Sequence, residues 1–261
     1  MRELVGPTEP AMFDNPTGTL VYPYLPAESY RAVFDFGCGC GRVARQLIQQ
    51  SPRPTRYLGI DLHAGMIRWC RDNLAPHAAG FDFQHHDIGN VGLNPGAGKP
   101  HMSPFPADDS SFTLVNAWSV FTHLVEDQAG PYLGEVARVL SPGGFVNSTW
   151  FLFDKQDFPM MQESQNALYI NRVDPTNAVV FDRSWLRATA RSHGLAITSV
   201  FPATTPPVRG YQWVVVMRPL SEAVPEASFP PDMGEIAVVR ASNLRSDAHR
   251  IGLDPRSSEQ P

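Results

Sequence analysis

The sequence lacks the features that mark membrane and secreted proteins. No apolar run approaches the ~20 residues that span a bilayer, and residues 1–7 contain no apolar core of signal-peptide length. The three cysteines, Cys38, Cys40 and Cys70, are too few for a disulfide framework, and their spacing does not match the Cys-x-x-Cys pairs of zinc sites. We therefore expect a cytoplasmic protein with no membrane insertion and no metal site.

An excess of positive charge is also lacking. Lys and Arg number 21 against 26 Asp and Glu, a formal net charge of -5, which argues against the broad phosphate-neutralising surface of a nucleic-acid groove. In contrast, 43% of the 261 residues are hydrophobic and 10% aromatic, which is typical of globular proteins and sufficient for a full-sized core. The length fits one large α/β domain with additions, and no nucleic-acid partner is expected.

From residue 32 onward, apolar runs alternate with amphipathic stretches. The apolar runs predict strands at residues 32–36, 57–60, 81–85, 112–118, 145–151, 195–201 and 211–217. The amphipathic stretches predict helices at residues 41–50, 64–74, 126–140 and 183–193. This alternation implies parallel strands with right-handed crossovers, while the short Pro-rich connection between the last two strands implies antiparallel pairing. The prediction is a Rossmann-like, doubly wound α/β sheet of seven strands with an antiparallel last strand.

Three segments fall outside this alternation. Residues 1–31 are rich in Pro, Gly and aromatic residues and predict an ordered N-terminal arm in front of a domain at 32–220. Residues 154–182 predict an irregular, lid-like insertion, and the aromatic and Met residues at 153–170 suit an adaptable apolar pocket. Residues 221–261 hold one phenylalanine among five prolines and seven acidic residues, so we expect a largely disordered C-terminal tail.

A Gly-rich turn follows the first predicted strand. Gly37, Gly39 and Gly41 stand at alternate positions, where the missing side chains let the backbone turn sharply and approach a ligand. The spacing Gly39-x-Gly41-x-x-Ala44, with Asp61 at the end of the second strand, also fits the dinucleotide fingerprint. The turn therefore predicts a nucleotide-like ligand, and an NAD-dependent oxidoreductase is one alternative.

Two further carboxylates favour a different cofactor. Asp35 lies inside the first strand, where burial is unfavourable unless the carboxylate meets a cation or backbone N–H groups. Asp87 closes the third strand at the same edge of the sheet, in a position to accept from an exocyclic amine such as that of adenine. With the antiparallel last pair of strands, which a plain dinucleotide fold does not need, these residues favour a cationic ligand that carries adenine.

Together these segments resemble the class I S-adenosylmethionine-dependent methyltransferases of the small-molecule and saccharide type. The resemblance covers residues 32 to about 219 and is carried by Asp35-x-Gly37-x-Gly39-x-Gly41, Gly59-Ile60-Asp61 and residues 84–88, 112–124 and 138–144. It implies S-adenosylmethionine as the cofactor, with Asp35 beside it. It further implies that Gly37, Cys38 and Gly39 line the methionine part of the cofactor and that Asp61 binds the ribose. Leu62 would then flank the adenine, and Asp87 and Ile88 would contact its edge. Asn116, Ala117 and Trp118 would face the sulfonium and the acceptor.

The same resemblance bears on the acceptor. The Asn/Asp-Pro-Pro-Tyr/Phe motif that marks amino methylation is absent after the fourth strand, where the chain reads Asn116-Ala117-Trp118-Ser119. DNA adenine methylation is therefore disfavoured, and a hydroxyl of a small molecule or saccharide is the favoured acceptor. His123 is the candidate catalytic base, because a base adds roughly 10²–10⁴ in rate when a hydroxyl is methylated.

Alternatives remain open at this point. His85 and His86 occupy opposite faces of a strand, so at most one of them can face the pocket. Methylation at nitrogen or carbon is an alternative to methylation at oxygen. Because methyl transfer needs few side chains beyond those that hold the reactants, the sequence also allows a binding or regulatory protein that retains the fold without turnover.

Overall fold

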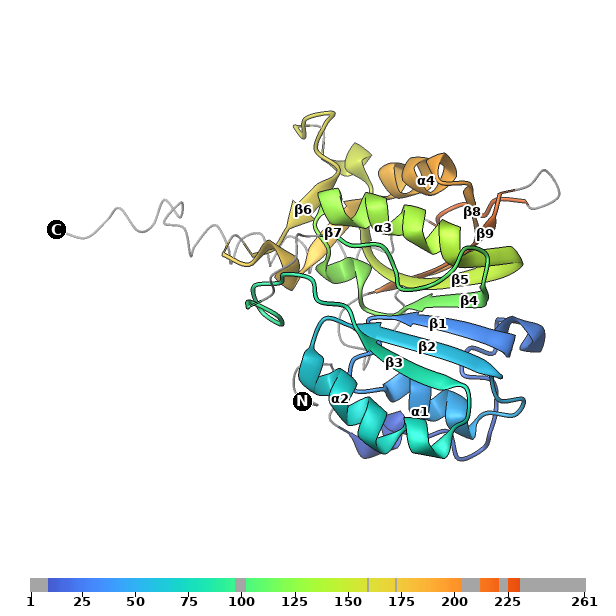
Figure 1. The fold of residues 1–261 in the computed structure, drawn as a ribbon. Coiled ribbons are helices and arrows are strands. Elements are labelled where there is room, and N and C mark those ends of the chain that lie inside the picture. Colours follow the sequence, from blue (N-terminus) through green and yellow to red (C-terminus); the bar gives the residue numbers. More distant parts are fainter. Residues whose placement is uncertain are drawn as a thin grey trace.

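A mixed β-sheet with helices on both faces forms the centre of the protein in the computed structural model (Figure 1). The structure describes residues 9–96, 102–158, 160–171, 173–202, 212–220 and 225–230. Five parallel strands follow the order β3-β2-β1-β4-β5. They are β1 (Ala32–Phe36), β2 (Arg56–Asp61), β3 (Phe81–His85), β4 (Phe112–Ala117) and β5 (Leu140–Phe153).

The far edge of the sheet is antiparallel. β9 (Trp213–Pro219) pairs antiparallel with β5, and β8 (Leu195–Phe201) pairs antiparallel with β9. The short connection between the last two predicted strands implies the antiparallel pairing of β8 with β9, whereas the position of β9 beside β5 is a finding of the structure. The predicted Rossmann-like, doubly wound sheet with its antiparallel last strand is therefore confirmed.

Two short strands depart from the prediction. The last residues of β5 extend past β9 and pair in parallel with β7 (Val179–Asp182), which pairs antiparallel with β6 (Ala167–Tyr169). The insertion at 154–182, predicted to be irregular, therefore contains two strands, and the described part of the sheet has nine instead of seven. Strands of three and four residues are too short to show a periodic pattern.

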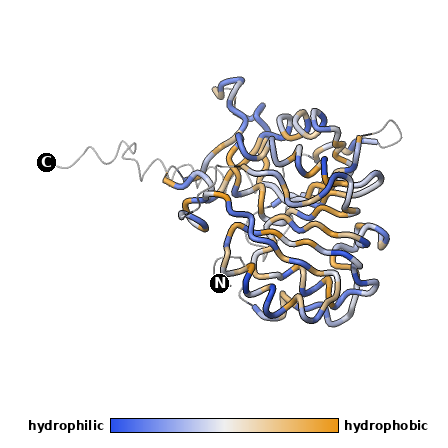
Figure 2. The backbone as a smooth tube through the Cα atoms, in the orientation of Figure 1, coloured by the Kyte–Doolittle hydropathy of each residue, from blue (hydrophilic) through white to orange (hydrophobic). Residues whose placement is uncertain are grey.

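The helices cover the two faces in pairs. α1 (Arg42–Gln49) and α2 (Ala64–Asn73) lie on one face, with α3 (Glu126–Val139) and α4 (Arg183–Ser192) on the other (Figure 1). A hydrophobic core lies on each face of the sheet, and β1 contributes to both. Its Val33 packs with side chains of α1 and α2, whereas its Phe34 packs with those of α3. Hydrophobic stretches follow the central strands (Figure 2). None of the described helices combines the length and apolar character needed to cross a bilayer.

The ends of two elements show where local signals succeed and fail. Asp182 before the predicted helix at 183–193 and Gly194 after it are typical cap residues, and the structure confirms both, because the Asp182 carboxylate accepts the Trp185 N–H at 3.0 Å and Gly194 follows α4 with a φ of 76°. The sequence pattern also favours a turn at residues 141–144, but the structure places these residues within β5. There the register between β4 and β5 shifts, which accommodates Gly143 at a φ of 76°.

Both described ends of the chain pack on this domain. The arm, from Glu9, contains the 3-10 turns η2 (Pro10–Phe13) and η3 (Ala27–Arg31), and its Asp14 forms an ion pair with Arg45 of α1 at 2.7 Å. Residues 225–230 lie against α4, where Glu226 pairs with Arg187 at 2.8 Å. The rest of the predicted tail, at 221–224 and 231–261, and the start of the arm, at 1–8, lie outside the described residues.

Candidate cofactor and acceptor site

The Gly-rich turn after β1 forms a tight backbone cradle. Gly37, Gly39 and Gly41 have φ values of 76°, 54° and 76°, a region that residues with a Cβ disfavour. The Gly37 N–H donates to the Ile60 carbonyl of β2 at 2.8 Å, which fixes the turn against the neighbouring strand. A Cβ on Gly37 would lie 2.4 Å from Cγ2 of Val120. The turn therefore requires glycine at position 37 for both conformation and space.

Asp61, the last residue of β2, anchors the same turn. Its Oδ2 accepts the N–H of Gly39 and its Oδ1 accepts the N–H of His63, both at 2.8 Å. Burial raises the pKa of the Asp61 carboxyl, although both hydrogen bonds act in the opposite direction. Each oxygen retains a second acceptor direction, so the carboxylate can accept a ligand hydroxyl while it anchors the turn.

Asp35 is buried inside β1 with two donors of its own. The Tyr57 hydroxyl donates to Oδ2 at 2.6 Å, and the Asn116 side-chain amide donates to Oδ1 at 2.7 Å. Burial raises the pKa of Asp35, and both hydrogen bonds oppose that rise. Tyr57 and Asn116 therefore stabilise this carboxylate in addition to the cationic ligand that the sequence predicts. Tyr57 was missed because nothing in the pattern of β2 distinguishes it from an ordinary core tyrosine.

A cavity of about 590 Å³ opens at the carboxyl ends of the parallel strands, the edge at which α/β sheets bind ligands. This volume lies within the range of roughly 300–1,000 Å³ for small-molecule sites. Most of the predicted site residues line it: Asp35, Gly37, Cys38, Gly39, Asp61, Leu62, Ile88, Asn116, Trp118 and His123. The described residues contain no group of three or more His, Cys, Asp or Glu side chains that could hold a metal ion.

Of the predicted site residues, Ala117 is buried in the hydrophobic core and does not line the cavity, and neither does Asp87. Its Oδ1 accepts the Asn94 amide at 3.0 Å and lies 4.0 Å from Nε2 of His85. The same amide donates to the Ile88 carbonyl at 3.0 Å, because residues 90 and 94 pair and fold the loop back on itself. The Asp87 carboxylate thus forms its hydrogen bond within the loop after β3, while its neighbours His86 and Ile88 line the cavity.

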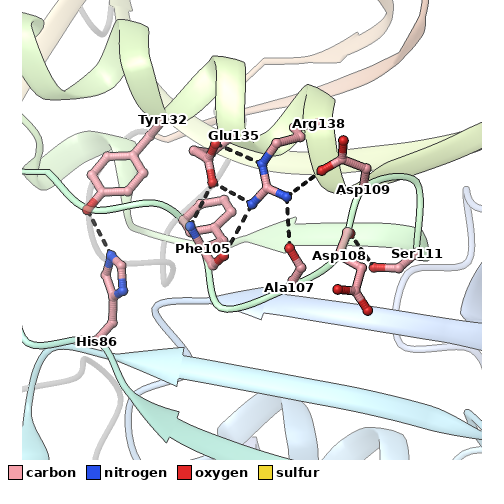
Figure 3. Close-up of polar contacts among 9 residues, drawn as sticks. All are labelled: His86, Phe105, Ala107, Asp108, Asp109, Ser111, Tyr132, Glu135 and Arg138. Carbon is pink, nitrogen blue, oxygen red and sulfur yellow. Dashed lines mark hydrogen bonds and ion pairs between the residues drawn. The ribbon is translucent and has the colours of Figure 1, made fainter.

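His86 and Tyr132 form a polar pair on the cavity wall that sequence reasoning underrated (Figure 3). Nε2 of His86 lies 2.9 Å from the Tyr132 hydroxyl. Burial raises the pKa of Tyr132 to about 12, so this hydroxyl stays neutral near pH 7. Behind it, Arg138 of α3 pairs with Glu135 and with Asp109 of the loop before β4, both at 2.7 Å (Figure 3). The ion pairs hold the helix that carries Tyr132.

His123 ends the 3-10 turn η5 (Phe121–His123) after β4 and lines the cavity. Its Nδ1 lies 3.0 Å from the Thr176 carbonyl oxygen. Because a carbonyl oxygen only accepts, Nδ1 carries the proton, and the neutral ring keeps its lone pair on Nε2. The ring nitrogen that can accept a proton is therefore Nε2.

The insertion covers the cavity, but with residues other than those expected. Residues 174 and 176–178 line it, whereas the aromatic and Met residues at 153–170 do not, and Met160 is 95% exposed. The Asn90 amide donates to the Thr176 hydroxyl at 3.1 Å, which joins the insertion to the loop after β3. The structure therefore does not bring residues 153–170 to the cavity, whereas η7 (Pro175–Asn177) contributes to its wall.

The N-terminal arm supports the wall formed by Trp118. The Tyr22 ring stacks on Trp118 with 5.6 Å between centroids and 13° between planes. On the cavity wall, the Arg42 guanidinium lies 5.9 Å from the Trp118 ring. Sequence reasoning missed Arg42, whose position at the start of α1 next to the Gly-rich turn could have indicated it. Tyr22 of the arm thus supports Trp118, although Tyr22 itself does not line the cavity.

Comparison with known proteins relates this cavity to a family. Residues 33–144 match the family model described as a methyltransferase domain. The matched region includes the Gly-rich turn, Asp61 and His123, and therefore most of the cavity wall. Over this region the chain is similar to methyltransferase domains, which agrees with its resemblance to the class I S-adenosylmethionine-dependent methyltransferases.

A curated relative is similar over part of the chain. The chain is similar to the fatty-acid O-methyltransferase of Mycolicibacterium smegmatis, with 33% identity over 115 residues, 44% of this chain and 35% of that protein. The match thus spans about a third of the length of that relative.

Solved structures share the fold. An S-adenosylmethionine-dependent methyltransferase from Mesorhizobium loti matches with a TM-score of 0.52 and 16% identity over 74% of this chain and 93% of that one. The 1,6-didemethyltoxoflavin-N1-methyltransferase of Burkholderia thailandensis, which contains bound S-adenosylhomocysteine, matches with a TM-score of 0.51 and 17% identity over 73% and 71%. At these identities the likeness concerns the fold alone.

The residues that line the cavity fit S-adenosylmethionine as the cofactor. The carboxylates of Asp35 and Asp61 suit a ligand with positive charge and ribose hydroxyls. Leu62 and Ile88 offer apolar surface to a planar base. The glycine cradle leaves room for close approach of the ligand to the backbone. The Gly-rich motif alone leaves NAD open, and the match of residues 33–144 to a methyltransferase domain favours S-adenosylmethionine.

Proposed function

We propose that this protein methylates an oxygen, the hydroxyl of a small molecule or saccharide, with His123 as the general base. The observation that carries the proposal is the hydrogen bond from His123 Nδ1 to the Thr176 carbonyl. It leaves Nε2 as the proton acceptor of a residue on the cavity wall. A hydroxyl acceptor needs such a base, because the neutral oxygen must lose its proton as it is methylated.

The relative in Mycolicibacterium smegmatis supports methylation at oxygen. By its name it is a fatty-acid O-methyltransferase, and the similarity extends over 115 residues, 44% of this chain. The fold does not choose the atom, since the N1-methyltransferase of Burkholderia thailandensis shares it. The choice of a hydroxyl over the carboxylate of a fatty acid rests on His123, because a carboxylate is already ionised near pH 7 and needs no base.

In this proposal the chain holds and orients the reactants. S-adenosylmethionine supplies the methyl group on a sulfonium, which needs no further activation. The Gly-rich turn and Asp35 hold the methionine end, Asp61 accepts from the ribose, and Leu62 and Ile88 enclose the adenine. Asp87 is left out of this set, because its carboxylate is bonded to Asn94.

The remaining residues exclude water and take up the proton. Thr176 joins the insertion to Asn90 and to His123 above the sheet edge, which narrows solvent access to the cavity. In this proposal the acceptor hydroxyl would lie between Trp118 and His123. It would pass its proton to Nε2 as its oxygen bonds to the methyl carbon and the bond from that carbon to the sulfonium sulfur breaks, which would leave S-adenosylhomocysteine. Holding the acceptor in line contributes the larger share of the acceleration.

A matched pair of histidine variants tests the proposal. His123→Gln keeps a donor for the Thr176 carbonyl but removes the base, so turnover on a hydroxyl acceptor is expected to fall by roughly 10²–10⁴-fold. The affinity of His123→Gln for S-adenosylhomocysteine is expected to change less than about twofold, because the proposed cofactor contacts are made by the Gly-rich turn, Asp35 and Asp61 and not by His123. His77→Gln, in the turn after α2, is the control, and it is expected to retain full activity.

The acceptor screen uses phenols, sugars, amines and fatty acids, and mass spectrometry detects the added methyl group. A hydroxyl product that His123→Gln abolishes supports the proposal. Methylation of amines alone, or of fatty acids at an unchanged rate in His123→Gln, would show that the acceptor or the role of His123 is wrong.

A further inference from the structure

A row of three buried polar residues crosses the centre of the sheet. Asp35 on β1 is the register partner of Asn116 on β4, and Asn116 is the register partner of Asn147 on β5. Their relative exposures are 1%, 0% and 0%. Asp35 and Asn116 line the cavity, whereas Asn147 does not. Asn147 therefore lies one strand behind the site.

The hydrogen bonds along this row have a fixed direction. The Asp35 carboxylate only accepts, so Asn116 turns its Nδ2 toward it, at 2.7 Å. This leaves Oδ1 of Asn116 to accept from Nδ2 of Asn147 at 3.0 Å. Oδ1 of Asn147 in turn accepts from the Tyr24 hydroxyl of the N-terminal arm at 2.9 Å. Each amide orientation is thus set by its neighbour.

We infer that Asn147 is a positioning residue for the cofactor site. It donates to Asn116 Oδ1, which keeps the Asn116 amide oriented as a donor to Asp35 and holds the Asp35 carboxylate in place on the cavity wall. Tyr24 extends the same chain to the arm. The inference rests on the proposed function, in which Asp35 contacts the cofactor.

The composition of the row supports this role over simple packing. Apolar side chains would fill the same buried positions without any need for partners, whereas buried amides are tolerated only when their hydrogen bonds are satisfied. Here the amides form a continuous chain with one end at the cavity and the other at Tyr24, which also packs 4.7 Å from the Phe201 ring. A chain with this polarity transmits orientation, which packing does not require.

The variant Asn147→Asp reverses the direction of the row in a way that pH can undo. An ionised carboxylate at position 147 cannot donate to Asn116, and it competes with the Asp35 carboxylate for the hydrogen bond from the Asn116 side-chain amide. When the new carboxyl is protonated, its O–H donates to Asn116 Oδ1 and restores the native direction. The affinity of Asn147→Asp for S-adenosylhomocysteine, relative to wild type, is therefore expected to be nearly equal at pH 5 and about tenfold weaker at pH 8.

Taking the ratio to wild type removes the contribution of other titrating groups. Those that interact with the Asp35 charge are Arg42 of α1, Tyr57 and Asp61 of β2, Cys38 of the Gly-rich turn and Tyr22 of the arm. All of them are present in both proteins. Measurements are made well below the melting temperatures, so that loss of stability does not enter the binding constant.

Ser148→Ala is the matched control. Ser148 is the next residue of β5 and equally buried, and its hydroxyl bonds the Val215 carbonyl at 3.1 Å and the Trp150 Nε1 at 2.9 Å, away from the row. Its affinity ratio is expected to stay within twofold of wild type at both pH values. If Asn147→Asp does not fold, Asn147→Ala replaces it, with affinity expected to fall about three- to tenfold.

The outcomes separate the two claims. No binding of S-adenosylhomocysteine to folded wild-type protein overturns the proposed function and this inference with it. Binding to wild type with a pH-independent ratio for Asn147→Asp, or an Asn147→Ala affinity equal to that of Ser148→Ala, overturns the inference alone.

Discussion

Gly37 offers a quantitative test of the cradle on which the cofactor site depends. Gly37 and Gly143 both have a φ of 76°, but a Cβ on Gly37 meets Val120 at 2.4 Å, whereas a Cβ on Gly143 meets nothing within 4 Å. Gly143→Ala therefore reports the conformational penalty alone, roughly 1–2 kcal/mol. Gly37→Ala adds the overlap with Val120, for which overpacking data suggest about 1–3 kcal/mol more.

Urea denaturation measures these free energies of unfolding. Gly37→Ala is expected to lose about 2–5 kcal/mol and Gly143→Ala about 1–2 kcal/mol. The double variant Gly37→Ala, Val120→Ala removes the methyl group that collides, so it is expected to recover about 1–3 kcal/mol relative to the sum of the single variants. Equal losses for Gly37→Ala and Gly143→Ala, or strictly additive single variants, would refute the close approach of the turn to Val120.

Two further predictions follow from the carboxylates. Asp61→Ala is expected to weaken S-adenosylhomocysteine binding by about 1.5–3 kcal/mol, because it removes the proposed ribose acceptor and the hydrogen-bond acceptor of the Gly39 N–H. Asp72→Ala is the control. Unchanged affinity of Asp61→Ala in calorimetry would rule out this role of Asp61. Arg138 lowers the pKa of Glu135, so this pair stabilises the fold above the unfolded Glu pKa of about 4.3 and ceases to do so as pH falls through the lowered folded value. Glu135→Gln is therefore expected to lose about 1–3 kcal/mol at pH 7 and much less near pH 3 in thermal unfolding, and a pH-independent loss would contradict this.

The sequence predicted those parts of the fold that repeat a pattern. The seven long strands, the helices between them and the cap at Asp182 follow from periodicity and from local side-chain chemistry. β6 and β7 could not be predicted, because they pair with the overhanging end of β5, which is a tertiary feature. The turn at 141–144 has local turn chemistry, but the ladder between β4 and β5 outweighs it.

The site shows the same division. The glycines and Asp61 follow from the joint between a strand and its turn, where backbone geometry dictates the residue type. Asp87 was misplaced because the pairing of residues 90 and 94, which folds its loop back, leaves no periodic signal. Asn147 was missed because its importance comes from lateral register across the sheet, and single-sequence patterns carry no information on register partners.

The most direct test of the account is calorimetric titration of the folded wild-type protein with S-adenosylhomocysteine, followed by NAD. The account predicts binding of S-adenosylhomocysteine at micromolar or lower Kd and no binding of NAD. Tight binding of NAD without binding of S-adenosylhomocysteine would contradict the assignment of the cavity between Asp35 and Asp61 as the S-adenosylmethionine site.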